Sequence, residues 1–249
     1  MPVHELAQLT WEEVRELDRK NAVAILPVGA IEAHGPHLPL DTDVVIATAM
    51  ARAGARKLMD HGHVVLILPA LAYTAASFGS AFHGTLSISA ITVTALIVDV
   101  ARSLSDQGFR LLVLANVHLD PEHLTALNEA VKLARADRLL PIVFPDLTRK
   151  PWGTRLGDEF RSGACHAGRF ETSIVLHERA DAVRDEVRQF LAPNPQSLSK
   201  AIKAGKRTFE AAGGPRAYFG DPAAATADEG ARLVDALGAI LEEAVSAEI

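Results

Sequence analysis

The sequence of 249 residues contains a single cysteine, Cys165. One thiol cannot form a disulfide within the chain, which fits a protein of a reducing compartment. The first five residues also lack the basic and apolar regions of a secretory signal peptide. From both observations we expect a cytoplasmic location.

Aromatic residues are scarce, at 5%, so the core must depend on aliphatic side chains. Long apolar runs are missing as well. The most apolar stretch, residues 88–100, is too short to span a bilayer and is interrupted by Thr92, Thr94 and Asp99. Excess positive charge is also absent, because the formal net charge is -6. A negatively charged chain has no general affinity for nucleic-acid phosphates, so we expect neither a membrane nor a nucleic acid as partner.

The chain does contain a regular alternation of strand and helix patterns. Short apolar runs predict buried strands at residues 22–28, 64–68, 111–115 and 140–144. Helical patterns lie between and after them, at residues 44–59, 89–107, 121–136 and 227–244. Repeated strand–helix units predict an α/β fold with a mainly parallel sheet and helices on both faces. We expect residues 1–249 to form one domain.

The densest group of chemically active side chains follows the first predicted strand. Residues 29–43 contain two histidines and three acids, namely Glu32, His34, His37, Asp41 and Asp43. A single one of these could be an ordinary surface residue. Unpaired buried charges are costly, so a cluster is either solvated or bound to a cation. Its position after a buried strand favours a functional site, and mixed nitrogen and oxygen donors suit zinc, manganese or iron.

A second polar loop follows the predicted strand at residues 111–115. His118 and Asp120 are two residues apart, as are Glu32 and His34, and such pairs project to the same side of an extended segment. Asp120 has a competing role as the N-cap of the helix that begins at Pro121. The two roles can coexist because a carboxylate has several acceptor sites.

Three further segments have no clear element of their own. The loop at residues 69–85 is long enough to be functional. Residues 145–162 are irregular and predict either an active-site flap or a subunit contact. Residues 196–217 are basic, and we interpret them as a lid, a linker or a solvated segment.

These motifs together are similar to those of a known family. Residues 29–39, Gly-Ala-Ile-Glu-Ala-His-Gly-Pro-His-Leu-Pro, and the following Thr42-Asp43 closely resemble the signature of the creatininase family. The resemblance covers nearly the whole chain. It continues through Phe82-His83-Gly84-Thr85, His118, His166-Ala167-Gly168, Glu171-Thr172-Ser173 and Gly220-Asp221-Pro222. The first motif is long and specific, and the later ones support it by their order and spacing.

The resemblance implies a three-layer α/β/α sandwich, a homo-oligomer that is often a hexamer, and two divalent metal ions, zinc or manganese with iron as an alternative. It implies that Glu32, Asp43 and His118 hold one ion. His34, Asp43 and Asp120 would hold the other, so that Asp43 bridges the two. His166 matches the catalytic histidine of the family.

The implied chemistry is hydrolysis of an amide-type C–N bond in a small-molecule substrate, such as a cyclic amide or a formamide. One branch of the family acts on a peptide during cofactor maturation. Two ions would activate a shared water, and His166, with an unperturbed pKa of about 6.5, would protonate the leaving nitrogen. Glu171 has three open roles: it orients His166, it orients a metal ligand, or it stabilises the start of a helix.

Three departures from the family pattern argue against creatinine as the substrate. Asp120 stands where creatininase has a glutamate, Ser162 aligns with a substrate-contacting tryptophan, and His83 replaces a common proline. The first two also keep a second hypothesis open, a catalytically inactive protein that binds a metal or ligand. Cys165 is disfavoured as a nucleophile, and a nucleotide-binding protein ranks last because the chain lacks a Gly-x-Gly-x-x-Gly or Walker motif.

Overall fold

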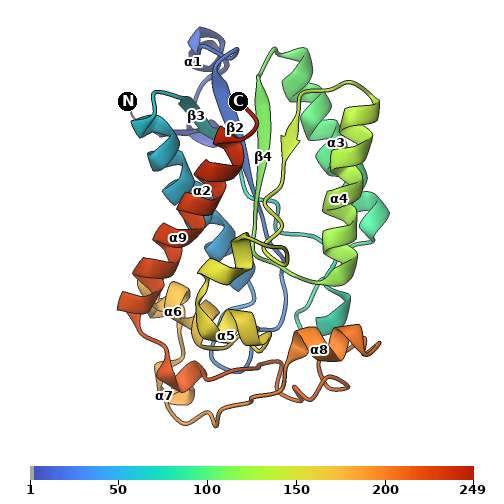
Figure 1. Cartoon of the computed structure of the whole chain (residues 1–249), viewed down its shortest axis with the longest axis vertical. Coiled ribbons are helices and arrows are strands. Elements are labelled where there is room, and N and C mark those ends of the chain that lie inside the picture. Colours follow the sequence, from blue (N-terminus) through green and yellow to red (C-terminus); the bar gives the residue numbers. More distant parts are fainter. Residues whose placement is uncertain (1–2) are drawn as a thin grey trace.

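The computed structural model describes residues 3–249, so Met1 and Pro2, part of the N-terminal stretch considered above, lie outside the described residues. The described chain folds around a five-stranded parallel sheet with the order β1-β3-β2-β4-β5 (Figure 1). Its strands are β1 (His4–Glu5), β2 (Ala22–Val28), β3 (Val64–Ile67), β4 (Leu111–Asn116) and β5 (Ile142–Val143). The predicted parallel sheet is confirmed.

Helices connect and cover the strands. They are α1 (Trp11–Glu16), α2 (Thr42–Asp60), α3 (Ala90–Asp106), α4 (Pro121–Ala136), α5 (Gly157–Ser162), α6 (Arg169–Glu178), α7 (Asp185–Arg188), α8 (Leu198–Lys203) and α9 (Ala227–Ser246). Three of the long helices begin at side-chain caps, namely α3 at Ser89, α4 at Asp120 and α9 at Thr226. Within the described residues, no helix combines the length and apolar character needed to cross a membrane.

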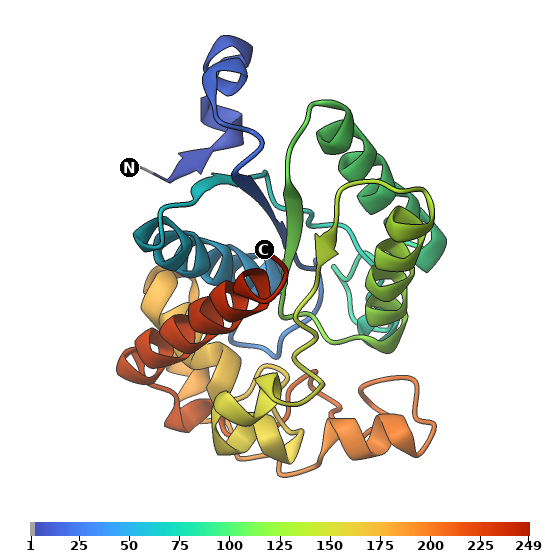
Figure 2. The same cartoon turned by 45° about the horizontal axis from the view of Figure 1, so that its top comes forward.

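The sheet separates two hydrophobic cores. Successive strand residues point to opposite faces, so Val23 and Ile25 of β2 pack with α2, α6 and α9, whereas Ala24 and Leu26 pack with α3 and α4. Figure 2 shows α2 and α9 on one side of the strands and α3 and α4 on the other. The three-layer α/β/α sandwich is therefore confirmed.

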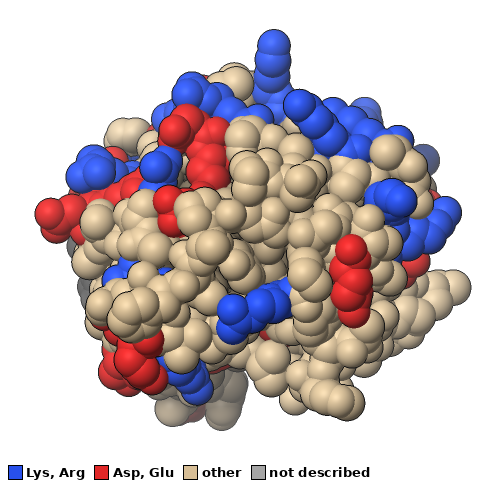
Figure 3. All heavy atoms as spheres, turned by 90° about the horizontal axis from the view of Figure 1, so that it is seen from below, with Lys and Arg blue, Asp and Glu red and all other residues tan. Residues whose placement is uncertain are grey.

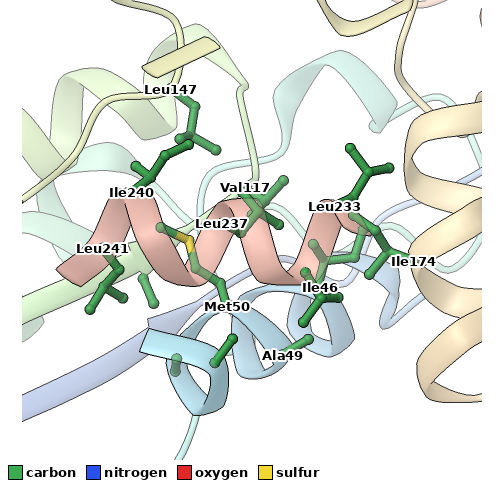
Figure 4. Close-up of a cluster of buried hydrophobic side chains, with 14 of the residues drawn as sticks. Ile46, Ala49, Met50, Val117, Leu147, Ile174, Leu233, Leu237, Ile240 and Leu241 are labelled. Atoms are coloured by element: carbon green, nitrogen blue, oxygen red, sulfur yellow. The ribbon is translucent and has the colours of Figure 1, made fainter. Parts of the chain in front are cut away.

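The core between α2 and α9 also fixes the elements that carry the polar loops (Figure 4). Gly238 of α9 allows the helices to approach closely, because a Cβ there would lie 2.6 Å from the Cβ of Ala53. Val117, just after β4, and Ile174 of α6 are buried in the same core. Three segments that are distant in sequence are thus held in one rigid arrangement.

The largest differences from the predictions lie outside the central strands. The strand predicted at residues 140–144 is reduced to Ile142–Val143, between two prolines that cannot donate to a ladder. Residues 145–162 include a short 3-10 helix (Trp152–Arg155) and α5. Residues 196–217 are not simply solvated, because Phe209 is only 2% exposed and packs under this segment.

Candidate metal centre

The polar loops meet at the carboxyl ends of β2 and β4, which are neighbouring central strands. The chain leaves β2 through α2 toward β3 on one side of the sheet, and leaves β4 through α4 toward β5 on the other. This divergence opens a crevice where ligands bind in parallel α/β sheets. In Figure 1 it is the end of the sheet nearest to α5 and α8.

Glu32, Asp43 and His118 form a first group whose ligand atoms lie within 4.8 Å of one another. Nδ1 of His118 is 3.0 Å from Oδ2 of Asp43 and 3.5 Å from Oε2 of Glu32. Nε2 of His118 is 2.8 Å from the carbonyl oxygen of Ala75, which can only accept, so this nitrogen carries the proton. That hydrogen bond leaves Nδ1 for a metal ion, as in most histidine ligands.

His34, Asp43 and Glu171 form a second group within the same distance limit. Nε2 of His34 lies 3.4 Å from Oδ1 of Asp43 and 3.6 Å from Oε2 of Glu171. Nδ1 of His34 donates to the carbonyl oxygen of Glu32 at 3.0 Å, which again leaves one ring nitrogen for a metal. Asp43 therefore turns one oxygen toward His34 and the other toward His118, the geometry of a bridging carboxylate.

His166 belongs to a third group, with Glu32 and His34. Its Nε2–H donates to the carbonyl oxygen of Ala33 at 3.0 Å. Its ring centroid is 4.4 Å from that of His34, and it is stacked on Phe209 at 4.2 Å. The imidazole is thus held in one orientation beside the other two groups.

The first two groups fit a cation because they contain buried polar atoms without hydrogen-bond partners among the described residues. These are Oε1 of Glu32, Nε2 of His34 and Oδ2 of Asp43. The three residues are at most 2% exposed, so their polar atoms are largely removed from bulk solvent. A divalent ion would satisfy them, and the mixture of imidazole and carboxylate suits zinc or manganese.

Asp120 takes the predicted cap position but lies in none of the three groups. Its Oδ1 accepts a hydrogen bond from the backbone N–H of Glu122 at 2.8 Å, which caps α4. Its Oδ2 accepts from the N–H of Phe78 at 3.1 Å and from the hydroxyl of Ser77 at 3.3 Å. The structure thus brings Glu32, His34, Asp43 and His118 together around Glu171 and His166, and turns the carboxylate of Asp120 toward another loop.

A cavity of about 960 Å³ opens onto these groups. Its inner wall includes Glu32, Asp43, His118, His166 and Glu171. Five basic side chains also line it, namely Lys132, Arg149, Lys150, Arg161 and Lys203. Figure 3 shows this end of the molecule as a mostly uncharged surface with a few separate acidic and basic side chains, and with more Lys and Arg along its upper and right-hand edges.

The family model described as creatininase, creatinine amidohydrolase, matches residues 7–245. The chain belongs to the creatininase family. This membership, predicted from the loop motifs, places the protein among hydrolases of amide-type bonds.

Several family members are similar over most of their length. The mycofactocin precursor peptide peptidase of Mycobacterium tuberculosis is 36% identical over 218 residues, which cover 86% of this chain and 80% of that protein. The creatinine amidohydrolase of Pseudomonas putida is 29% identical over 200 residues, covering 72% of this chain and 73% of that protein. A crystal structure of creatininase superimposes with a TM-score of 0.77 at 26% identity, covering 100% of this chain and 98% of that chain.

Protons and cations compete for the same atoms in this creatininase-family site. Burial raises the pKa of Glu32 to about 7 and that of Glu171 to about 8, against the opposing effect of the nearby histidines. Burial disfavours charge on His34 and His118, but Asp43 and the other carboxylates outweigh it and raise the pKa of both to about 10. Metal binding must therefore release protons, and it weakens as pH falls.

His166 differs from its expected state. Burial, followed by the positive charge of His34, lowers the pKa of His166 well below the usual 6.5. The imidazole is therefore neutral near pH 7, which corrects the expectation of an unperturbed acid. It must accept a proton before it can donate one.

Two neighbours of the site were not assigned from the sequence. Glu171 was recognised in a Glu-Thr-Ser motif, but its role was open because its distance from His34 depends on where α6 lies. Phe209 had no signal beyond being an aromatic residue in a basic segment. Of the positions that depart from the family pattern, Ser162 and His83 do not line the cavity.

Proposed function

We propose that this creatininase-family protein is a metal-dependent amidohydrolase that cleaves an amide bond in an extended substrate, most simply a peptide. The observation that carries the proposal is a cavity of about 960 Å³ with the candidate ligands on its inner wall. This volume is at the upper end for small-molecule pockets and far exceeds what a single small ring requires. The similarity to a precursor-peptide peptidase supports a peptide over the small cyclic amide expected from the sequence.

Two divalent ions, zinc or manganese, would be held by the groups that share Asp43. Glu32 and His118 belong to one group, and His34 to the other. When bound, the ions would lower the pKa of a water molecule and polarise the carbonyl of the scissile bond.

His166 would move the proton that the reaction requires. Its Nε2–H is committed to the carbonyl of Ala33, so Nδ1 is the nitrogen that accepts a proton. Because His166 is neutral near pH 7, it can take a proton from the attacking water and pass it to the leaving nitrogen. The carbonyl carbon gains a bond to oxygen, the C–N bond breaks, and a carboxylate and an amine are released. Such positioned acid–base catalysis typically contributes about 10²–10⁴-fold.

The outer part of the cavity favours a substrate with an anionic group. Lys132 pairs with Glu129 at 3.1 Å, and Arg149 pairs with Asp146 at 3.0 Å. The other basic residues on the cavity wall have no ion-pair partner in the part of the chain that the structure describes, and these are Lys150, Arg161 and Lys203. A carboxylate of a peptide, at its end or on an acidic side chain, would complement them.

The test uses protein stripped of metal by a chelator and then loaded with manganese or zinc. Creatinine and a library of short peptides, with free and amidated carboxyl ends, are incubated with it and followed by mass spectrometry. We expect peptide cleavage that depends on metal and is lost in Asp43→Ala, with faster cleavage of peptides that have a free carboxylate. Turnover of creatinine without peptide cleavage would contradict the proposed substrate class. Tight metal binding without turnover of any amide would favour an inactive binding protein.

A further inference from the structure

We propose that Glu171, and not Asp120, completes the second metal position together with His34 and Asp43. The proposal depends on the metal-dependent function above. It concerns which carboxylate of this chain binds the ion, and it departs from the ligand set implied by the sequence motifs.

Asp120 is the weaker candidate because it lies in none of the groups whose ligand atoms are within 4.8 Å of one another, and because both of its oxygens face hydrogen-bond donors. Oδ1 accepts from the first turn of α4 at 2.8 Å, and Oδ2 accepts from Phe78 and Ser77 at 3.1 and 3.3 Å. Turning either oxygen toward His34 would break contacts that cap a helix and tether the loop before it. Aspartate is also one methylene shorter than glutamate, so it reaches less far from a fixed backbone.

Glu171 already lies where a ligand is needed. It is on the first turn of α6, is 5% exposed, and has Oε2 3.6 Å from Nε2 of His34. That nitrogen is itself buried, at 1% residue exposure, and has no hydrogen-bond partner among the described residues. An oxygen of Asp43 also lies within 4.8 Å of the ligand atoms of both Glu171 and His34, so the three side chains can hold one ion together.

The position of Glu171 is fixed by its surroundings. Its Oε2 accepts a hydrogen bond from the N–H of Ala167 at 2.5 Å, and a carboxylate can keep this bond while its remaining lone pairs bind an ion. The start of α6 is held by Glu159, whose Oε1 accepts from the N–H of Phe170 at 2.8 Å. Ile174 anchors the same helix in the core. Little reorganisation is therefore required before Glu171 can bind a metal.

The experiment measures metal content rather than activity. Wild type, Glu171→Gln and Asp120→Asn are purified, stripped, equilibrated with zinc or with manganese, and freed of unbound ions. Ions per chain are then counted by inductively coupled plasma mass spectrometry, and affinities are measured by calorimetric titration. Both variants preserve side-chain size, and circular dichroism checks that each is folded.

We expect two ions per chain in wild type and in Asp120→Asn, and one in Glu171→Gln. The affinity for the second ion should fall more than about 100-fold in Glu171→Gln, which exceeds the usual effect of losing an outer hydrogen-bond partner. Asp120→Asn should instead lower the melting temperature, because an amide NH2 group cannot accept the hydrogen bonds that Oδ2 accepts from Phe78 and Ser77. Two ions in Glu171→Gln, loss of an ion from Asp120→Asn, or a single ion in wild type would each overturn the proposal. Wild type that binds no ion would overturn the proposed function itself.

Discussion

The imidazole of His166 lies against the ring of Phe209, with centroids 4.2 Å apart and planes inclined by 28°. Phe209 belongs to the segment between α8 and α9. Its ring also packs against Phe78 and Phe219, with ring centroids 6.0 and 6.1 Å away. A residue far from the metal-ligand motifs therefore helps to fix the orientation of the proposed proton carrier.

Replacing Phe209 with leucine should lower turnover without removing metal. An aromatic pair contributes about 0.5–1.5 kcal/mol beyond its buried area, so kcat should fall by about 2–13-fold. Phe82→Leu is the matched control, because the ring centroid of Phe82 is 6.2 Å from that of Phe209 but Phe82 does not stack on His166. An unchanged kcat in Phe209→Leu, measured at equal metal content, would show that the stack does not position the imidazole.

Replacing His166 with alanine should separate binding from chemistry. The variant should keep the ion content of wild type, because His166 Nε2 is committed to a backbone carbonyl and its role is proton transfer. Turnover should fall by about 10²–10⁴-fold. Loss of an ion would instead make His166 a ligand, as its place in the group with Glu32 and His34 allows. Full activity would remove it from the mechanism.

Replacing Gly79 with alanine should weaken the metal position that contains Glu32. A Cβ at residue 79 would lie 2.9 Å from Cγ and from Oε1 of Glu32, so the carboxylate would have to move away from His118. We expect the affinity for one ion to fall about 10–100-fold, as for changes that misplace a ligand. Ser80→Ala, at the adjacent exposed position, is the control. Calorimetric titration that gives equal affinities would contradict the predicted displacement.

His37 should make the stability of the protein sensitive to acid. Burial, together with the charges of His34, Arg188 and Arg216, lowers the pKa of His37 to about 3, and its Nε2 contacts the hydroxyl of Thr172 at 2.9 Å. In the unfolded chain the same group protonates near pH 6.5. Between these values the unfolded state binds more protons, so the free energy of unfolding decreases as pH falls below 6.5.

The His37→Gln variant should lose the part of the pH dependence of unfolding that comes from His37. When the pH is lowered from 7.5 to 5.5, the free energy of unfolding of wild type should decrease by about 1.4 kcal/mol more than that of the variant. The reason is that His37 takes up a proton in this range only in the unfolded state. Urea unfolding of both proteins at the two pH values measures the difference. His61→Gln is the matched control, since that side chain is 60% exposed at the end of α2. Parallel pH dependences of wild type and His37→Gln would refute the prediction.

Much of the fold was predictable because its determinants are local. The strand predicted at residues 22–28 is β2, because an unbroken apolar run identifies a buried strand. The helix predicted at residues 121–136 is α4, because a capping acid followed by proline marks a helix start. Both signals depend only on residues close in sequence. Edge elements were less predictable. The strand β1 (His4–Glu5) depends on pairing with β3, and β5 is limited by the prolines around it.

The sequence by itself determined which residue types gather at the site, because His34, Glu32 and Asp43 occupy one loop and its helix start. It also determined that Asp120 precedes a helix it can cap. Only the tertiary structure decided which acid faces His34, since donors from Ser77 and Phe78 compete for the Asp120 carboxylate while α6 carries Glu171 inward. Such competition is between groups distant in sequence, and its outcome depends on the packing of helices against the sheet rather than on any local pattern.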